Sequence, residues 1–341
     1  MRSRTWRPAE PTRKASTQAA KRALLAADGW VRSHTVDLLP QPQRVLAARC
    51  TAEVARYADS LTHYRFETLH TAHVHAIVEL FELGAYEAAM AAADEVLEDC
   101  AAQGRPFCVA ALRARAERAR CLQWLDRPEE AIEEFELVQR LTGEPPTIGR
   151  PWLLSMRYCL ALARRESGEL EASTEDLRAL VSDMVAEFGQ DSAWMVATVV
   201  QLARNLAASG EVSTAIDMVS VLLPVSARLR GPMSKETLTL RSRIARWTIV
   251  TDDRRRGQRL AAQVLSDFTR AGLSTCSECC ELRYDFAESL FEDGELDYAV
   301  AQLTSLRDDL EESVWIDSTF AASVRADLES WRSLRPGGAP L

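Results

Sequence analysis

The sequence predicts an all-helical fold, a right-handed superhelical solenoid built from antiparallel helix pairs. Three observations support this prediction: a turn signature that recurs every 42 residues, columns of small residues in register with it, and helical periodicity between the turns. The turn residues are Gly84, Asp126, Gly168, Gly210, Asp252 and Gly294. Five successive spacings of 42 residues without an insertion indicate six copies of one helix–turn–helix unit.

Small residues recur on both sides of each turn. Five residues after the turn residue stand Ala89, Ala131, Ser173, Ala215, Gly257 and Ala299. Seven residues before it stand Ile77, Ala119, Ala161, Ala203, Ala245 and Ala287, of which all but Ile77 are alanine. Two antiparallel helices can approach closely only where the facing side chains lack bulk, so these columns predict the contact between the two helices of each pair. Branched aliphatic residues twelve positions after the turn then fill the space between pairs: Val96, Val138, Leu180, Leu222, Val264 and Leu306.

The segments between the turns are rich in Ala, Leu, Glu and Arg and place apolar residues at helical spacing. Four regions follow from the register. Residues 1–14 form a basic disordered arm, residues 15–69 a divergent helical pair that caps one end, and residues 70–321 the six repeats. Residues 318–335 form a C-terminal capping helix with a polar outer face, as terminal units of repeat proteins require.

The turn sequence Gly84-Ala85-Tyr86-Glu87-Ala88-Ala89 resembles that of the tetratricopeptide repeat. The 42-residue period is similar to the kinesin-light-chain-like variety, whose inter-repeat signature is approximated by residues 231–241. The resemblance implies a scaffold that binds proteins or peptides and has neither an active site nor a cofactor. Only three Lys accompany 38 Arg, which is typical of a GC-rich bacterial gene.

Composition excludes several classes of protein. The net charge of −9 argues against general affinity for nucleic acid, although residues 1–22 carry seven basic residues and one acid. No run of about 18 apolar residues occurs, and no apolar segment follows the N-terminal charges, so we expect neither a membrane span nor a secretory signal. Eight scattered cysteines fit reduced thiols, and we expect a cytoplasmic protein.

Two groups of potential metal ligands are weak candidates. His70 and His73 share a helix face, but no carboxylate completes a known zinc motif. Cys276, Cys279 and Cys280 are the densest thiol cluster, yet no histidine follows residue 75. We interpret these cysteines as small buried hydrophobic residues, with a redox-sensitive thiol at a helix start as the alternative. No metal and no catalytic residue is therefore predicted.

In tetratricopeptide proteins the first helix of each pair lines the concave groove. The resemblance therefore implies that groove positions lie six and nine residues before the turn residue. These two columns hold four arginines among twelve positions, and four guanidiniums there would favour an acidic segment or a free C-terminus. The alternative is that each arginine pairs with a neighbouring carboxylate. The predicted partner-binding residues are Arg120, Arg204, Arg243, Arg246, Gln201, Tyr158, Trp124 and Tyr284.

A second arginine column, eleven residues before the turn, is interpreted as structural: Arg115, Arg157, Arg241 and Arg283. Two classes of function remain open for the groove. The first is an adaptor that captures a partner segment. The second is a regulatory sensor or accessory subunit that binds a signal or precursor peptide for a separate enzyme or transcription factor.

Overall fold

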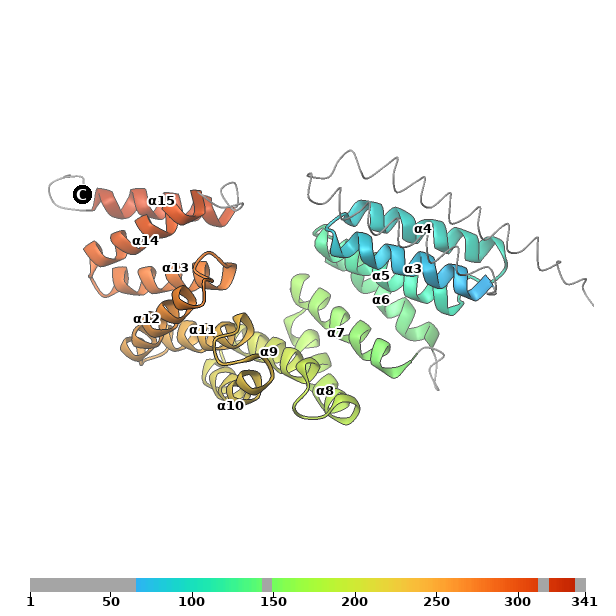
Figure 1. Ribbon diagram of the computed structural model, residues 1–341, viewed down its shortest axis with the longest axis horizontal. Coiled ribbons are helices and arrows are strands. Elements are labelled where there is room, and N and C mark those ends of the chain that lie inside the picture. Colours follow the sequence, from blue (N-terminus) through green and yellow to red (C-terminus); the bar gives the residue numbers. More distant parts are fainter. Residues whose placement is uncertain (1–65, 143–148, 312–318, 335–341) are drawn as a thin grey trace, which may run out of the picture. The chain divides into compact units, whose positions relative to one another are not determined.

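The protein is all-helical in the computed structural model, which describes residues 66–142, 149–311 and 319–334 (Figure 1). These residues form thirteen α-helices and no strand. The expected basic arm (1–14) and the expected N-terminal cap up to residue 65 lie outside the described residues. The chain forms two compact units that divide after Asp176, within helix α8.

The first unit holds two complete helix pairs and the start of a third. Its helices pack against their neighbours in chain order from α3 to α7, and the first helices of successive pairs, α3 and α5, are also in contact. The helices are α3 (Phe66–Glu82), α4 (Tyr86–Ala102), α5 (Val109–Trp124), α6 (Pro128–Thr142), α7 (Arg150–Glu166) and α8 (Leu170–Phe188), of which α8 continues into the second unit.

The second unit repeats the same arrangement. Its pairs are α9 with α10, α11 with α12, and α13 with α14, and the first helices α11 and α13 pack together. A single helix, α15, covers α14. The helices are α9 (Ala193–Ala208), α10 (Val212–Arg230), α11 (Lys235–Ile249), α12 (Arg254–Arg270), α13 (Ser277–Glu292), α14 (Leu296–Glu311) and α15 (Thr319–Ser333).

Five of the six turns share one backbone geometry. In the first turn, the amides of Gly84 and Ala85 donate to the carbonyls of Phe81 and Leu80 at 2.9 and 3.0 Å. This arrangement ends a helix on a residue with positive φ, which glycine adopts without steric cost. Asp126 takes the same place with a φ of 58° and is the one non-glycine residue with positive φ in the described chain. Asp126 therefore has the same backbone conformation as the turn glycines with which the sequence register aligns it.

The fifth turn differs from the other five. Asp252 has no positive φ, and α11 ends three residues before it, at Ile249, whereas the helices before the other five turns end two residues before the turn residue. The amide of Asp253 here donates to the hydroxyl of Thr251 at 3.4 Å, a bond within the turn itself. The sequence register therefore predicts the position of this turn but not its conformation.

The columns of small residues form the contact between the helices of each pair. All six residues in each column are buried, and so are the six branched aliphatic residues. Gly257 marks the closest approach: a Cβ at this position would lie 2.4 Å from the backbone nitrogen of Ile249 on α11. In the third pair, Ser173 instead donates its hydroxyl to the carbonyl of Ala161 at 2.6 Å. The small residues are thus required by the distance between the helices.

By length and composition alone, α10 could cross a membrane, with a mean hydropathy of 1.4 over its most apolar window. It is also a member of a helix pair, packing against α9 and α11. Ala215, Val219, Leu222 and Ser226 are buried along its inner face, and Pro224 interrupts its interior. We expected from the sequence that no segment would be long and apolar enough to cross a membrane; among the described residues α10 is an exception by length and composition.

Candidate functional site

Three of the predicted groove arginines lie close together in the second unit. Arg204 is on α9, and Arg243 and Arg246 are one helical turn apart on α11. The charges of Arg204 and Arg246 both act on Arg243 and lower its pKa, so the three guanidiniums form one electrostatic group. We call these three residues the arginine cluster.

Arg246 is neutralised by the next repeat. Its Nε donates to Asp285 Oδ2 at 2.5 Å, and its Nη1 donates to Glu281; both carboxylates are on α13. For Arg246, the alternative of pairing with neighbouring carboxylates is therefore the one observed. The pair joins α11 to α13 and stabilises the contact between two repeats.

Arg204 uses a neutral neighbour on its own helix. Its Nη1 donates to Oε1 of Gln201 at 2.9 Å, three residues earlier. Both side chains are half-buried. The predicted residues Gln201 and Arg204 are thus brought together, with the amide orienting the guanidinium.

Arg243 is the exception in the cluster. Within the described part of the chain it makes no hydrogen bond or ion pair, and its Nε is buried without an acceptor. Its burial lowers the pKa of Arg243 to about 10, repulsion from Arg204 and Arg246 adds to this effect, and attraction to Glu281 and Glu278 only partly opposes it. An unpaired cation in such a position is costly unless an anion accompanies it. The geometry thus leaves one guanidinium available to bind a negatively charged group.

Arg120, the fourth predicted arginine, belongs to the first unit and has partners there. Its Nη1 donates to Glu117 at 2.7 Å, and its Nη2 lies 3.7 Å from Glu82. Its guanidinium carbon lies 4.0 Å from the centre of the Phe81 ring. Burial raises the pKa of Glu117, and Arg120 opposes that rise. The charge of Arg120 is thus balanced by Glu117 of its own helix and by Glu82 of the preceding repeat.

The three predicted aromatic residues have different surroundings. Trp124, at the end of α5, is 65% exposed and stacks on Tyr86 with ring centres 5.5 Å apart. Tyr284 donates its hydroxyl to Asp327 of α15 at 2.6 Å, and its burial together with this bond raises the pKa of Tyr284. Tyr158 is half-buried on α7. Of the three, Trp124 presents the most surface to solvent.

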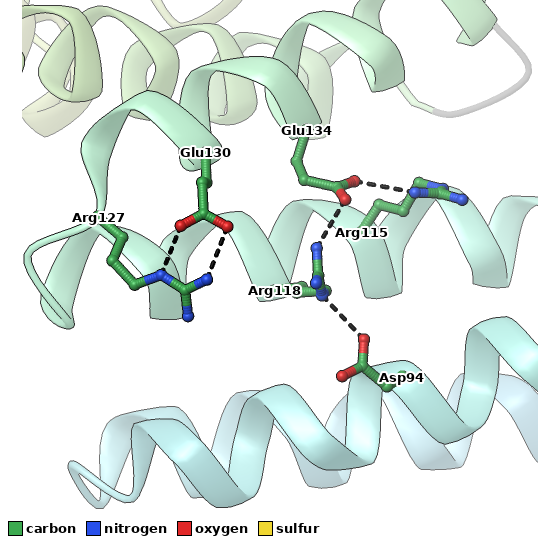
Figure 2. A network of polar contacts seen from close by, with 6 residues as sticks. All are labelled: Asp94, Arg115, Arg118, Arg127, Glu130 and Glu134. Carbon is green, nitrogen blue, oxygen red and sulfur yellow. Dashed lines mark hydrogen bonds and ion pairs between the residues drawn. The ribbon is translucent and has the colours of Figure 1, made fainter.

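In the second arginine column, Arg115 and Arg241 each pair with a carboxylate on the second helix of their own pair, as expected for a structural role, and Arg118 near Arg115 makes similar contacts (Figure 2). Arg115 donates to Glu134 of α6 at 3.0 Å, and Arg118 binds both Glu134 and Asp94 of α4. In the second unit Arg241 pairs with the buried Asp267 at 2.6 Å. Arg118 therefore joins two successive helix pairs, a role that the sequence reasoning did not assign to it.

In the predicted thiol cluster Cys279 and Cys280 are buried, and Cys276, at the start of α13, is half-buried, with its pKa raised by burial. Burial raises the pKa of Cys279 to about 12 and that of Cys280 to about 11, against the alternative of a reactive thiolate. Among the described residues, no three His, Cys, Asp or Glu side chains gather as metal ligands. His70 and His73 belong to α3, but their side chains lie outside the described residues. One further pair of thiols is close: the sulfurs of Cys100 and Cys108 are 3.4 Å apart.

Solved structures share this architecture. A putative kinesin light chain of Podosopora anserina, with nearly identical TPR-like repeats, is 21% identical, covers 59% of this chain and 95% of its own, and gives a TM-score of 0.50. The chain therefore has the tetratricopeptide-repeat fold. A Rap protein complexed with Competence and Sporulation Factor is 10% identical, covers 92% of this chain and 82% of its own, and gives a TM-score of 0.63.

Aspartyl phosphate phosphatase F from Bacillus subtilis has the same fold, at 10% identity, with coverage of 98% of both chains and a TM-score of 0.52. No family model matches the sequence, and no curated protein matches it. The tetratricopeptide-repeat fold is typical of surfaces that bind other proteins. The fold alone does not identify a ligand, which depends on the chemistry of a site such as the arginine cluster.

Proposed function

We propose that this protein is a non-enzymatic scaffold that binds a protein or peptide partner, and that one carboxylate of the partner binds to Arg243. The observation that carries the proposal is a half-buried guanidinium without an acceptor, flanked by two further cations. The seven described cysteines are free, which supports a reducing cytoplasmic setting, and the excess of 38 Arg over three Lys supports a bacterial one.

A carboxylate suits this position for geometric reasons. Guanidinium offers planar N–H donors that match the two oxygens of a carboxylate. Arg204 and Arg246 add positive potential but keep their own acceptors, so they attract the anion while Arg243 donates to it. The carboxylate can be a Glu or Asp side chain or the C-terminus of the partner.

Binding can be measured with a defined probe. The probe is a fluorescein-labelled tetraglutamate peptide with a free C-terminus, compared with an amide-capped tetraglutamine peptide by fluorescence anisotropy. Loss of one member of a desolvated charge pair typically costs about 2–5 kcal/mol, so Arg243→Leu should weaken binding at least about tenfold. Arg256→Leu, which removes an exposed arginine of the same unit, is the matched control.

Three results would contradict the proposal: no binding of tetraglutamate, equal binding of tetraglutamine, or equal loss in both arginine variants. If inorganic phosphate competed at concentrations far below those of the peptide, the cluster would bind a free anion instead of a partner segment. Binding should also weaken as salt is raised, because part of the attraction is long-ranged.

A second candidate function is a regulatory sensor that binds a signal peptide. The observation that favours it is the fold shared with a Rap protein that was solved with Competence and Sporulation Factor bound. An adaptor and a sensor differ in what binding does. In limited proteolysis, peptide binding should change the rate at which the helices of a sensor are cleaved, whereas the helices of an adaptor should be cleaved at the same rate with and without peptide.

A further inference from the structure

A second surface, in the first unit, has the opposite chemistry to the arginine cluster. Phe81 at the end of α3, Tyr86 at the start of α4 and Trp124 at the end of α5 form one group of rings. We call these three residues the aromatic platform. The planes of Tyr86 and Trp124 are only 14° from parallel, and Phe81 meets Trp124 edge-on at 6.4 Å. The stack on Tyr86 holds the indole in place although most of its surface is exposed.

Two carboxylates lie near the aromatic platform, Glu82 next to Phe81 and Tyr86, and Glu166 next to Gln123. Glu82 follows Phe81 in sequence and is 66% exposed, with Arg120 at 3.7 Å as its nearest cation. Glu166 of α7 is exposed and accepts a hydrogen bond at 3.1 Å from Gln123, the residue before Trp124. Within the described chain Glu166 has no ion pair. An approaching cation would therefore find one carboxylate without an ion pair, Glu166, and one, Glu82, whose exposed pair with Arg120 at 3.7 Å neutralises it only in part.

The neighbouring cations are already in use. Arg127, three residues after Trp124, binds both oxygens of Glu130 at 2.6 Å (Figure 2). Arg120 is held by Glu117 and lies over the Phe81 ring. That contact also shows that a guanidinium fits over an aromatic ring of this platform, so the same chemistry is available on the more exposed Trp124.

We propose that the aromatic platform and its carboxylates Glu82 and Glu166 bind an arginine side chain of a partner protein. The planar guanidinium would stack on Trp124 while its N–H groups donate to the carboxylates. Indole is the aromatic ring that attracts cations most strongly, and exposed Trp flanked by acids is the complement of a basic segment. This site is independent of the arginine cluster and stands whether or not that cluster binds an anion.

The test uses the full chain labelled with 5-fluorotryptophan and observed by ¹⁹F NMR. The chain has eight tryptophans, and the Trp124 resonance is assigned by its disappearance in Trp124→Phe. The probe is acetyl-Gly-Arg-Gly-Arg-Gly-amide, and its control is the same peptide with citrulline, a neutral analogue of arginine. Trp194, which is 42% exposed and stacks on Phe188, serves as the matched internal control.

The arginine peptide should shift the Trp124 resonance in a saturable manner, while the citrulline peptide should not. The Trp194 resonance should stay in place with both peptides. Replacing Glu82 and Glu166 by Gln should weaken the interaction about tenfold, with the Trp124 stack itself retained. Equal shifts with both peptides, equal shifts of Trp124 and Trp194, or no effect of the double substitution would overturn the proposal.

The chain's own basic arm is the competing occupant. Full-length protein in which the basic residues of the arm are replaced by Gln separates the two cases; these residues are Arg2, Arg4, Arg7, Arg13 and Lys14. If the Trp124 resonance moves in that variant without any peptide, the arm occupies the platform and the assignment to a partner is wrong. An unchanged resonance supports the assignment.

Discussion

Gly257→Ala should destabilise the protein, although helix propensity alone predicts the reverse. Gly257 lies inside α12, where replacing Gly by Ala normally gains about 1 kcal/mol. A Cβ here would lie 2.4 Å from the nitrogen and 2.7 Å from the Cα of Ile249, and 2.8 Å from the carbonyl carbon of Thr248. All three atoms are backbone, so no side chain can move aside, and α11 and α12 must separate instead.

The required movement sets the magnitude. Carbon atoms pack best about 3.5–4.0 Å apart, so the helices must part by about 1 Å, and a gap of that size forfeits a quarter to a half of each affected contact. Overpacking of this kind costs about 1–3 kcal/mol. Subtracting the gain in propensity leaves a net loss of up to about 2 kcal/mol in the free energy of unfolding.

Urea unfolding followed by far-UV circular dichroism measures this loss. The reciprocal control is Ala215→Gly, at the equivalent position of the preceding pair, where the methyl group fits and is fully buried. That change should also destabilise, by about 1 kcal/mol, through lost propensity. If Gly257→Ala raised the urea midpoint while Ala215→Gly lowered it, propensity would dominate and the close approach of α11 and α12 would be refuted.

Three further predictions concern the same packing. Ala215→Leu should cost about 1–3 kcal/mol in the free energy of unfolding by overpacking, and urea unfolding at the wild-type midpoint would contradict this. Asp126→Gly should raise the thermal midpoint, because glycine adopts the positive φ of this turn without strain, whereas Asp126→Ala should lower it. Mild oxidation with diamide should join Cys100 to Cys108, whose sulfurs are 3.4 Å apart, and peptide mapping by mass spectrometry that finds only free thiols would count against that distance.

Much of the fold can be predicted from the sequence, because residues at fixed positions of the 42-residue repeat make the same packing contact in every helix pair. The small residue at 257 and the branched residue at 264 each report one contact that recurs every 42 residues. The conformation of the turn at Asp252 could not be predicted in this way, because it depends on the hydroxyl of Thr251 and not on the turn residue alone.

The candidate site was predictable only in part. Counting back from the turns places Arg243 and Arg246 on one face of a helix, but it cannot show which of them has a carboxylate. Asp285, which pairs with Arg246, lies 39 residues later in the chain. The stack of Trp124 on Tyr86 likewise joins residues of different repeats. Pairing across repeats depends on side-chain conformation, which periodicity does not encode.

On this account Arg243 serves to bind a ligand and does not stabilise the folded protein. Burial, with repulsion from Arg204 and Arg246, lowers its pKa from the ordinary value of an arginine to about 10, a shift that corresponds to about 3 kcal/mol against the charged form before solvent screening is considered. Because the folded state lowers the pKa of a base, this penalty is fully present below pH 10 and is relieved only as the pH rises from there toward the pKa of an unfolded arginine. At neutral pH, Arg243→Leu should therefore remove it.

The most direct measurement is thermal unfolding of the wild type and Arg243→Leu at pH 7, with and without the tetraglutamate peptide. Without peptide, the variant should be at least as stable as the wild type, by up to about 1 kcal/mol after screening. With peptide at 100 times its dissociation constant, the wild type should gain about 2.7 kcal/mol and the variant almost nothing. A variant that is less stable alone, and that the peptide stabilises as much as the wild type, would show that Arg243 is structural.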